Sequence, residues 1–393
     1  MKQLQTPYFL IHKDVLDGQL AMLQAALAEN WPNSVVGYSY KTNTLPWVID
    51  YFHSRGCFAE VVSDDEYRLG KHMGVGPNRF VYNGPIKTKE TFLEALESGS
   101  YVNIDAQREI DWLRELDPQK EYKLGIRVNF DLESACPGHT QCPEEGGRFG
   151  FCYENGEFEK ALKKVCQQGH RVAGLHLHTS SRTRGLDIYR AIAEMACRIA
   201  ETFDLQLDYV DVGGGFFGGL PTKPQFDEYM ALMAGILRRR FSPGKTALIL
   251  EPGMAVIGAP VSYVTTVIDV KDTTANRFVI TDGSRTSIDP LMTKSNYFCR
   301  YHRHTDKPAL PKQVIGGFTC MEHDRLFTAV DQPELSVGDQ IIYEKVGAYT
   351  MCLTPLFIRY FPDVYVDDGL TMKLVRKAWT PEEYLQNSVL DEE

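Results

Sequence analysis

The sequence lacks any long hydrophobic run. No segment of its 393 residues approaches the ~18 consecutive apolar residues that a membrane-spanning helix requires. The first residues, MKQLQTPYFLIHKD, also lack the apolar core and the small-residue cleavage site of a signal peptide. Both absences argue against a membrane or secreted protein, and we expect a cytoplasmic one.

Positive charge is also in short supply. Forty-two Lys and Arg residues stand against 52 Asp and Glu residues, which gives a formal net charge of −10. Nucleic acids and anionic lipids bind to basic surfaces. The densest basic run, Arg238-Arg239-Arg240, lies at the end of an expected helix, where cations suit the helix dipole. We therefore expect a small-molecule substrate, with neither nucleic acid nor a membrane as a partner.

Cysteine is too scarce for a disulfide framework. The chain has nine cysteines, and an odd number leaves at least one thiol free. The closest group is CPGHTQC, from Cys136 through His139 to Cys142. A structural zinc site needs four ligands, and no second pair lies nearby. A polar loop with two reduced thiols is the favoured interpretation, and we expect no metal.

What is present is the composition of a globular enzyme. Hydrophobic residues make up 43% of the chain and charged residues 24%, and ~150 residues per domain predicts two domains. From about 30 to 255, β-rich segments alternate with stretches whose apolar residues recur at i, i+3 and i+4. The expected strands are 34–40, 57–62, 79–83, 101–105, 122–130, 172–178, 207–213 and 247–252.

This alternation favours an α/β fold. Eight β/α units in ~225 residues match a (β/α)8 barrel, here 30–255, and a doubly wound sheet would also fit. The rest of the chain, 256–393, reads as a mainly β domain with short strands between turns. Residues 1–29 should form a helix and a strand, TPYFLIH, that joins the β domain. The loop 131–155 is long and rich in Gly, Pro and Glu, and we expect it to reach over an active site.

Polar residues follow the carboxyl ends of the expected barrel strands, where barrel enzymes build their sites. They are Lys41, Glu60 with Ser63, Arg127 with Asn129, His176 to Ser181, the turn GGGFFGG at 213–219, and Glu251. A glycine-rich turn brings backbone N–H groups close to an anion, and a partly buried lysine can act as a nucleophile. A lysine, a phosphate cradle, a flat histidine and a carboxylate in one cleft describe a pyridoxal phosphate site.

The chain resembles the fold-type III pyridoxal-phosphate decarboxylases, which include diaminopimelate and ornithine decarboxylase, over nearly its whole length. The matching segments are YSYKTN at 38–43, EVVSDDE at 60–66, RFG at 148–150, GLHLHTSS at 174–181, DVGGGF at 211–216, EPG at 251–253, TCMEHD at 319–324 and GAYT at 347–350. The resemblance implies a TIM-like barrel of the alanine racemase type followed by a β domain. It also implies pyridoxal 5′-phosphate as cofactor, and a homodimer with two active sites at the interface.

The resemblance further implies roles for single residues. Lys41 would hold the cofactor as a Schiff base, His178 would stack on its ring, and Glu251 would face its pyridine nitrogen. Cys320 would reach the partner subunit's site and control the proton at Cα after carbon dioxide leaves. The other implied contacts are Ser181, Gly214, Gly215 and Tyr349 to the phosphate, Arg127 near the cofactor, and Asp324 as an interface acid.

The sequence also allows three alternative functions to be compared with decarboxylation. An amino-acid racemase on the same fold would place an arginine near the pyridine nitrogen, whereas Glu251 there favours a protonated ring that accepts the electrons of a carbanion. A catalytically silent homologue that binds a partner enzyme need not keep Lys41 and Cys320 together. An NAD-dependent oxidoreductase would need its glycine-rich turn after the first strand.

The sequence departs from the family pattern at positions that bear on the substrate. Met254 follows Glu-Pro-Gly, where the family usually has an arginine. Met321 follows the cysteine where relatives acting on diaminopimelate or diamines carry an acid, with Glu322 one residue later. The segment at Asp289-Pro290 lacks the arginine of the diaminopimelate enzymes' Arg-Pro. Lys294 falls at the amine-binding aspartate of ornithine decarboxylase.

These departures lead to a substrate hypothesis. Loss of a complementary charge in a desolvated site costs selectivity, so we expect the main substrate to be neither diaminopimelate nor ornithine. Lys294, or Arg359 in LFIRYFP, would suit a distal carboxylate. The hypothesis is a decarboxylase of secondary metabolism that resembles the citryl-diaminopropionate decarboxylases of siderophore pathways. Diaminopimelate decarboxylase proper is the alternative.

Overall fold

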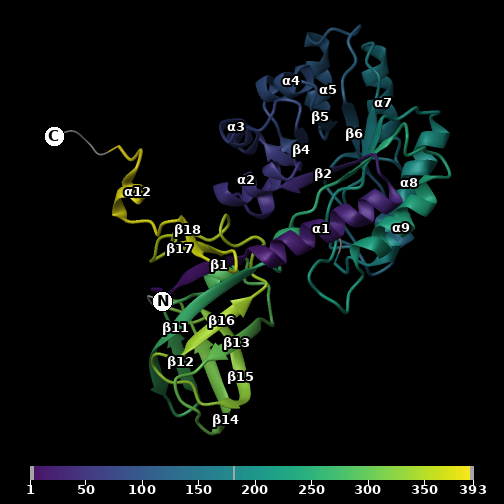
Figure 1. Ribbon diagram of the computed structural model, residues 1–393. Coiled ribbons are helices and arrows are strands. Elements are labelled where there is room, and N and C mark those ends of the chain that lie inside the picture. Colours follow the sequence, from purple (N-terminus) through teal and green to yellow (C-terminus); the bar gives the residue numbers. More distant parts are fainter. Residues whose placement is uncertain (1–3, 180–181, 390–393) are drawn as a thin grey trace. The chain divides into compact units, whose positions relative to one another are not determined.

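A computed structural model describes residues 4–179 and 182–389. The chain divides into two compact units (Figure 1). One unit, the barrel unit, runs from Gln19 to Val256. The other, the β unit, combines the N-terminal segment up to Gly18 with the chain from Ile257 onward. Helix α1 (Lys13–Asn30) begins in the β unit and ends in the barrel unit.

Eight parallel strands of the barrel unit close into a barrel. Each strand pairs with its neighbour, β5 pairs with β6, and β10 pairs with β2 to complete the ring. The predicted (β/α)8 barrel is therefore confirmed, and closure excludes the doubly wound sheet. The strands are β2 (Ser34–Ser39), β3 (Phe58–Ser63), β4 (Phe80–Ile86), β5 (Tyr101–Ile104), β6 (Leu124–Asn129), β8 (Gly174–His176), β9 (Tyr209–Asp211) and β10 (Ala247–Leu250).

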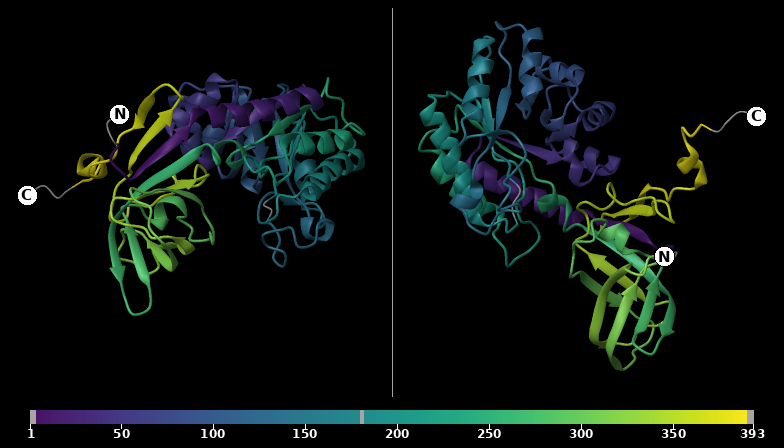
Figure 2. Two further views of the ribbon diagram at one scale, coloured as in Figure 1. Left: turned by 60° about the horizontal axis from the view of Figure 1, so that its bottom comes forward. Right: turned by 180° about the vertical axis from the view of Figure 1, so that it is seen from behind.

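Helices lie outside these strands (Figures 1 and 2). Their apolar faces pack inward: α8 buries Ile188, Ile192 and Ile199, which recur at helical spacing. Ser63 caps α3 by accepting the backbone N–H of Glu66. The helices are α2 (Pro46–Ser54), α3 (Asp64–His72), α4 (Lys89–Glu97), α5 (Gln107–Trp112), α7 (Glu157–Gln167), α8 (Leu186–Thr202), α9 (Phe226–Leu237) and α10 (Met254–Ile257).

The long loop after β6 contains two short elements. Helix α6 (Leu132–Ala135) is capped by Asp131, whose side chain accepts the backbone N–H of Ser134. Strand β7 (Phe151–Cys152) pairs in parallel with the last two residues of β6, Val128 and Asn129. The loop therefore leaves the barrel and returns to the strand that it follows.

The β unit is a nine-stranded sheet, which confirms the expected mainly β domain. Strand β1 (Tyr8–His12) lies between β11 and β17, antiparallel to the first and parallel to the second. The other strands are β11 (Val261–Asp272), β12 (Arg277–Thr281), β13 (Phe298–His302), β14 (Ala309–Gly316), β15 (Arg325–Pro333), β16 (Gln340–Glu344), β17 (Asp363–Asp367) and β18 (Met372–Arg376). Two short helices are α11 (Arg285–Ile288) and α12 (Pro381–Leu385).

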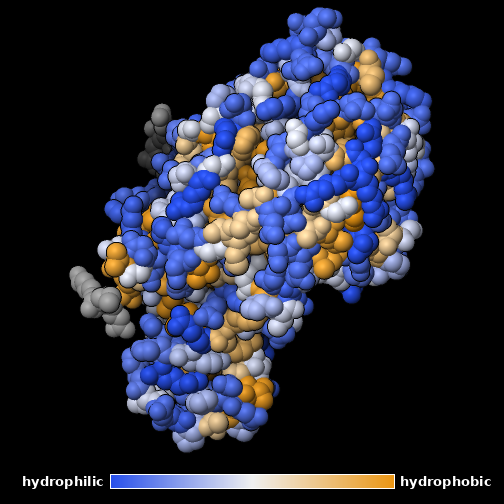
Figure 3. Space-filling view, turned by 45° about the vertical axis from the view of Figure 1, so that its right-hand side comes forward, coloured by the Kyte–Doolittle hydropathy of each residue, from blue (hydrophilic) through white to orange (hydrophobic). Residues whose placement is uncertain are grey.

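Hydrophilic residues dominate the face of the molecule drawn in Figure 3, with apolar residues scattered among them. Among residues 4–179 and 182–389, no helix combines the length and the hydropathy that crossing a bilayer requires.

Candidate active site

Four of the predicted site residues lie at or near the carboxyl ends of the barrel strands. Lys41 lies in a 3₁₀ turn (Tyr40–Thr42) directly after β2. Arg127 lies in β6, His178 two residues after β8, and Glu251 directly after β10. Arg127 and Glu251 are buried, His178 is half-buried, and the Lys41 side chain is 35% exposed. Ser181, a predicted phosphate ligand, lies outside the described residues.

Lys41 has an acidic partner at the end of the next strand. Its Nζ donates a hydrogen bond of 2.9 Å to Oε2 of Glu60, which is almost fully buried. Ser39 Oγ donates to the same carboxylate oxygen over 2.6 Å. Glu60 therefore orients the amine of Lys41, a role that the sequence analysis did not assign to it.

Two asparagines link the acids inside the barrel. Asn83, in β4, donates through Nδ2 to both Glu60 and Glu251. Asn103, in β5, donates to Oδ1 of Asn83 over 2.8 Å and to Oδ2 of Asp211 over 3.3 Å. All five side chains are buried. Asn83, Asn103 and Asp211 were not predicted as site residues; their signal in the sequence is polarity within strands that are otherwise apolar.

The pKa values of the buried acids Asp211 and Glu251 are shifted in opposite directions. Burial and the neighbouring Glu251 carboxylate raise the pKa of Asp211 well above its usual value. Burial by itself would raise the pKa of Glu251, but His176, Lys41 and His178 together hold that pKa below its usual value. His176 Nε2 lies 3.5 Å from Glu251 Oε1. These opposite directions place a proton shared by the pair on Asp211 rather than on Glu251.

This group also has the composition of a metal site. His176, Asp211 and Glu251 each place one ligand-type atom within 4.8 Å of the others. Their carboxylates already accept N–H groups, from Asn83 to Glu251 and from the Gly213 backbone to Asp211 over 2.9 Å. Burial and the nearby Glu251 carboxylate also favour a proton on Asp211, so we interpret the two acids as a proton-holding pair.

His178 is held as a neutral ring. Its Nδ1 accepts the backbone N–H of Gly214 over 3.1 Å, which leaves the ring proton on Nε2. Burial lowers the pKa of His178 to about 3, and the positive charges of Arg127 and Lys41 act in the same direction. The ring lies nearly parallel to that of His176, at 12°. A flat, uncharged imidazole is suited to stacking on an aromatic ligand.

The glycines after β9 leave no room for side chains. Gly213 has φ +70, and a Cβ there would lie 2.4 Å from His178 atoms. A Cβ on Gly214 would lie 2.2 Å from the carbonyl oxygen of Glu251. Tyr189 fixes the turn because its hydroxyl donates to the Gly214 carbonyl over 2.9 Å. The backbone of this turn thus packs directly against His178 and Glu251, as a cradle for an anionic ligand requires.

The side chain of Arg127 is held by two hydrogen bonds and by a ring of the loop that follows β6. Its Nη1 donates to Asp105 over 2.8 Å, and its Nη2 to the His178 carbonyl over 3.3 Å. The guanidinium lies 4.6 Å from the ring centre of Phe149. Its Nε is buried without a hydrogen-bond partner among the described residues. Phe149 belongs to the RFG segment, so this part of the loop borders the site.

Cys320 and Asp324 share a turn in the β unit. Cys320 is exposed. Asp324 is buried, and its carboxylate accepts from Thr319 N, Thr319 Oγ1, Ser284 Oγ and Arg285 N at 2.7 to 3.1 Å. Both of its oxygens are therefore engaged. This geometry gives Asp324 a role in shaping the Cys320 turn, and its expected role as an interface acid that meets the substrate stays a prediction.

The remaining predicted residues also lie in the β unit. Glu322 is exposed, 3.2 Å from Arg325, and Tyr349 has the left-handed φ +56. Lys294 donates through Nζ to the Ile288 carbonyl over 2.7 Å, and burial lowers its pKa. That ammonium already stabilises its own loop. Contact of Lys294 or Glu322 with a substrate stays a prediction.

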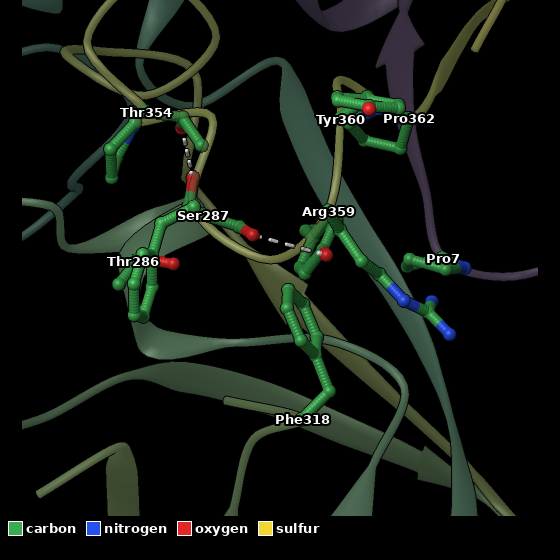
Figure 4. A pocket seen from close by; sticks show the side chains of 11 residues that line it. Pro7, Thr286, Ser287, Phe318, Thr354, Arg359, Tyr360 and Pro362 are labelled. Carbon is green, nitrogen blue, oxygen red and sulfur yellow. Dashed lines mark hydrogen bonds between the residues drawn. The ribbon is translucent and has the colours of Figure 1, made fainter. Parts of the chain in front are cut away.

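Arg359 lines a pocket of the β unit (Figure 4). The pocket holds about 320 Å³ of space, part of it open to solvent. The guanidinium lies 5.1 Å from the ring centre of Phe318, two residues before Cys320. Its Nη1 donates to the Asp282 carbonyl over 3.3 Å. Arg359, one of the two cations predicted to meet a distal carboxylate, therefore borders a cavity.

The sequence of the chain matches a known protein family. The family described as "Pyridoxal-dependent decarboxylase, pyridoxal binding domain" matches residues 18–258, more than half of the chain. The chain belongs to the pyridoxal-dependent decarboxylases. It is an enzyme of that family, with pyridoxal phosphate as its cofactor and amino-acid decarboxylation as its reaction.

Relatives of this decarboxylase extend over most of its length. The diaminopimelate decarboxylase of Aquifex aeolicus is 26% identical over 368 residues, which is 90% of this chain and 85% of that protein. The L-glutamyl-[BtrI acyl-carrier protein] decarboxylase of Niallia circulans is 24% identical and covers 100% and 95%. The M. jannaschii diaminopimelate decarboxylase in complex with L-lysine has the same fold, at TM-score 0.86, 20% identity and coverage of 98% and 92%.

The residues of this decarboxylase's barrel fit its cofactor. A lysine amine lies at the barrel mouth, and the glycine turn provides a cradle that a Cβ would fill. A neutral imidazole and an ionised carboxylate lie beside that turn. These are the groups that an aldehyde, a phosphate, an aromatic ring and a pyridine nitrogen require.

Proposed function

We propose that Lys41 binds pyridoxal phosphate and that the protein decarboxylates an amino acid at Cα, releasing an amine and carbon dioxide. The observation that carries the proposal is the placement of Lys41, His178 and Glu251 at the carboxyl ends of three barrel strands, beside the glycine turn. When bound, the cofactor accepts the electron pair that the departing carboxylate leaves at Cα. Glu251 would keep a proton on the pyridine nitrogen, because a neighbouring carboxylate favours the charged form of that group.

The other barrel residues orient and desolvate the site. Neutral His178 would cover one face of the cofactor ring, and the backbone of Gly214 and Gly215 would receive the phosphate. Glu60 orients the Lys41 amine, which would hold the cofactor. Arg127 is held rigidly by Asp105 and anchors His178 through its carbonyl.

We infer a homodimer in which the partner's Cys320 donates the proton to Cα. The exposed position of Cys320 on a turn braced by Asp324 supports this assignment. Exposed apolar side chains of the same unit, at Leu353, Phe357 and Ile358, support an interface that a second copy covers.

For the substrate, we propose an amino acid with a distal carboxylate or acyl conjugate. Arg359 beside a cavity supports this choice, as does the Niallia circulans relative, which acts on a glutamyl group. The expectation that excludes diaminopimelate gains no support, since several relatives are diaminopimelate decarboxylases. Diaminopimelate itself carries a distal carboxylate, so it belongs among the candidates with the siderophore-type conjugates.

A carbon-dioxide-release screen in deuterated water tests the proposal. Diaminopimelate, glutamate, side-chain glutamyl conjugates, lysine and ornithine would be compared by kcat/KM. We expect the carboxylated substrates to be preferred, and Arg359→Gln to raise their KM while leaving that for ornithine unchanged. Lys294→Gln is the matched comparison. Preference for ornithine or lysine would contradict the substrate class, and racemised substrate without carbon dioxide would contradict decarboxylation.

We also propose a cytoplasmic location. The nine cysteines form no disulfide bond among the described residues. Reduced thiols are typical of the cytosol, whereas secreted proteins pair theirs. Cell fractionation with a tagged chain would check this proposal, and recovery outside the cytosolic fraction would contradict it.

A further inference from the structure

Members of the family usually carry an arginine directly after Glu-Pro-Gly, and this chain has the uncharged Met254 there instead. A guanidinium from another part of the barrel reaches the same place: Arg184 Nη1 lies 2.8 Å from Met254 Sδ. Resting on the proposed function, we propose that Arg184 replaces the missing arginine and binds the phosphate of the cofactor. The positive charge has thus moved to a residue 70 positions away in the sequence.

The backbone of Arg184 is held in an uncommon conformation. Its φ of +53 lies in the left-handed region, which costs free energy for a residue other than glycine. Tyr229 stabilises this conformation because its hydroxyl donates to the Arg184 carbonyl over 2.6 Å. The start of the loop is also tied, since the Arg182 backbone N–H donates to the His139 carbonyl over 2.8 Å. A strained residue kept by specific contacts is typical of a functional position.

Arg184 also adjoins the glycine turn. Its guanidinium lies 5.5 Å from the ring centre of Phe217, which is part of the turn at 213–219. The turn in turn packs against α10, because a Cβ on Gly218 would lie 1.8 Å from the Ala255 carbonyl oxygen. The glycine turn, the first residue of α10 and the Arg184 guanidinium therefore converge on one place.

The contact with Met254 positions the charge without cancelling it. A thioether is a weak acceptor, so it takes a donor from the guanidinium but adds no negative charge. Guanidinium groups bind phosphate oxygens through paired N–H donors. A phosphate beside the glycine turn would complete this arrangement of donors.

The test compares pyridoxal phosphate with pyridoxal, which has the same ring and aldehyde but no phosphate. Apoenzyme is titrated with each, and Kd is read from the Schiff-base absorbance. Arg184→Gln should raise Kd for pyridoxal phosphate by about tenfold or more, the scale of one charge-assisted hydrogen bond, and leave Kd for pyridoxal within about twofold. Arg182→Gln, an exposed position in the same loop, is the matched control and should change neither.

A second variant tests the exchange of positions directly. Arg184→Gln combined with Met254→Arg should recover most of the lost affinity for pyridoxal phosphate. If Arg184→Gln fails to fold, Arg184→Lys, which preserves the charge, is compared with the wild type instead. We expect it to raise Kd for pyridoxal phosphate by a smaller factor and to leave Kd for pyridoxal unchanged. Equal losses for both ligands would assign Arg184 a structural role and overturn the proposal. No change for either would overturn it as well.

These outcomes are distinguishable from failure of the proposed function. If wild-type protein forms no Schiff base with either ligand, the function of Lys41 is wrong. If wild-type protein binds both and Arg184→Gln keeps the wild-type preference for the phosphate, only the role of Arg184 is wrong.

Discussion

The backbone N–H of Gly214 donates to Nδ1 of His178 over 3.1 Å, and this one bond selects the tautomer of the imidazole. The ring can accept there only while it is neutral at that nitrogen. Its burial, which lowers the pKa of His178 to about 3, has the same consequence. The glycine turn thus serves two purposes, since it leaves space for an anion and keeps the neighbouring ring uncharged.

The low pKa of His178 predicts a specific loss of stability in acid. In the unfolded chain the histidine gains a proton near pH ~6.5, whereas the folded protein resists protonation until about pH 3. The contribution of neutral His178 to the free energy of unfolding is fully present above pH ~6.5. It is lost as the pH falls from ~6.5 toward about 3, at up to about 1.4 kcal/mol per pH unit. His178→Asn should reduce this slope by about one proton in chemical unfolding, and His72→Asn, on the surface of α3, should reduce it less. Equal slopes would contradict a neutral His178.

The assignment of one proton to Asp211 predicts unequal effects of two similar substitutions. Asp211→Asn replaces a neutral acid by a neutral amide and should lower kcat less than about tenfold. Glu251→Gln removes the ionised carboxylate and should lower kcat by about 100-fold or more, the scale of a lost charge at a desolvated reacting centre. Steady-state release of carbon dioxide measures both. A larger loss for Asp211→Asn would reverse the two protonation states.

The role of Cys320 predicts complementation between subunits. Cys320→Ala should lower kcat by about 10²-fold or more, as loss of a general acid does, whereas Cys352→Ala, at another exposed cysteine, should not. Lys41→Ala and Cys320→Ala subunits, each inactive alone, would then be mixed and reassociated. Hybrid dimers have one intact site when the partner supplies the cysteine, so about a quarter of wild-type activity should return. No recovery after verified exchange of subunits would contradict a shared site.

The tight packing of the glycine turn predicts that its second glycine tolerates no side chain. Gly214→Ala would place a Cβ 2.2 Å from the Glu251 carbonyl oxygen. We expect a loss of about 1–3 kcal/mol in the free energy of unfolding, and weaker binding of pyridoxal phosphate. Gly235→Ala, in α9 with no atom within 4 Å of the new Cβ, should instead stabilise the protein by about 0.5–1 kcal/mol. Thermal unfolding with and without cofactor checks both.

The order of the barrel and the placement of Lys41, His178 and Glu251 could be predicted from the sequence. Strand ends are marked by a change from apolar to polar residues, and parallel strands carry those ends to one side. The side-chain directions within the strands could not be predicted in the same way. Asn83 and Asp211 were therefore missed, because they lie inside segments that read as buried and apolar.

Two further results needed three-dimensional contacts. Lys294 stands in a sequence position that suggests a substrate contact, but its ammonium bonds to the carbonyl of Ile288 in a neighbouring turn. Arg184 carries no motif of its own, and only its approach to Met254 indicates a role. Both depend on how loops fold back, which local propensities do not encode.

The proposed function depends most on covalent attachment of the cofactor to Lys41. Purified protein would be incubated with pyridoxal phosphate, reduced with borohydride, digested and mapped by mass spectrometry, with Lys41→Arg treated in parallel. We expect a Schiff-base absorbance band in the wild type, and a reduced pyridoxyl group on the peptide that contains Lys41. Absence of the band, or a label on another lysine that persists in Lys41→Arg, would contradict the proposed active site.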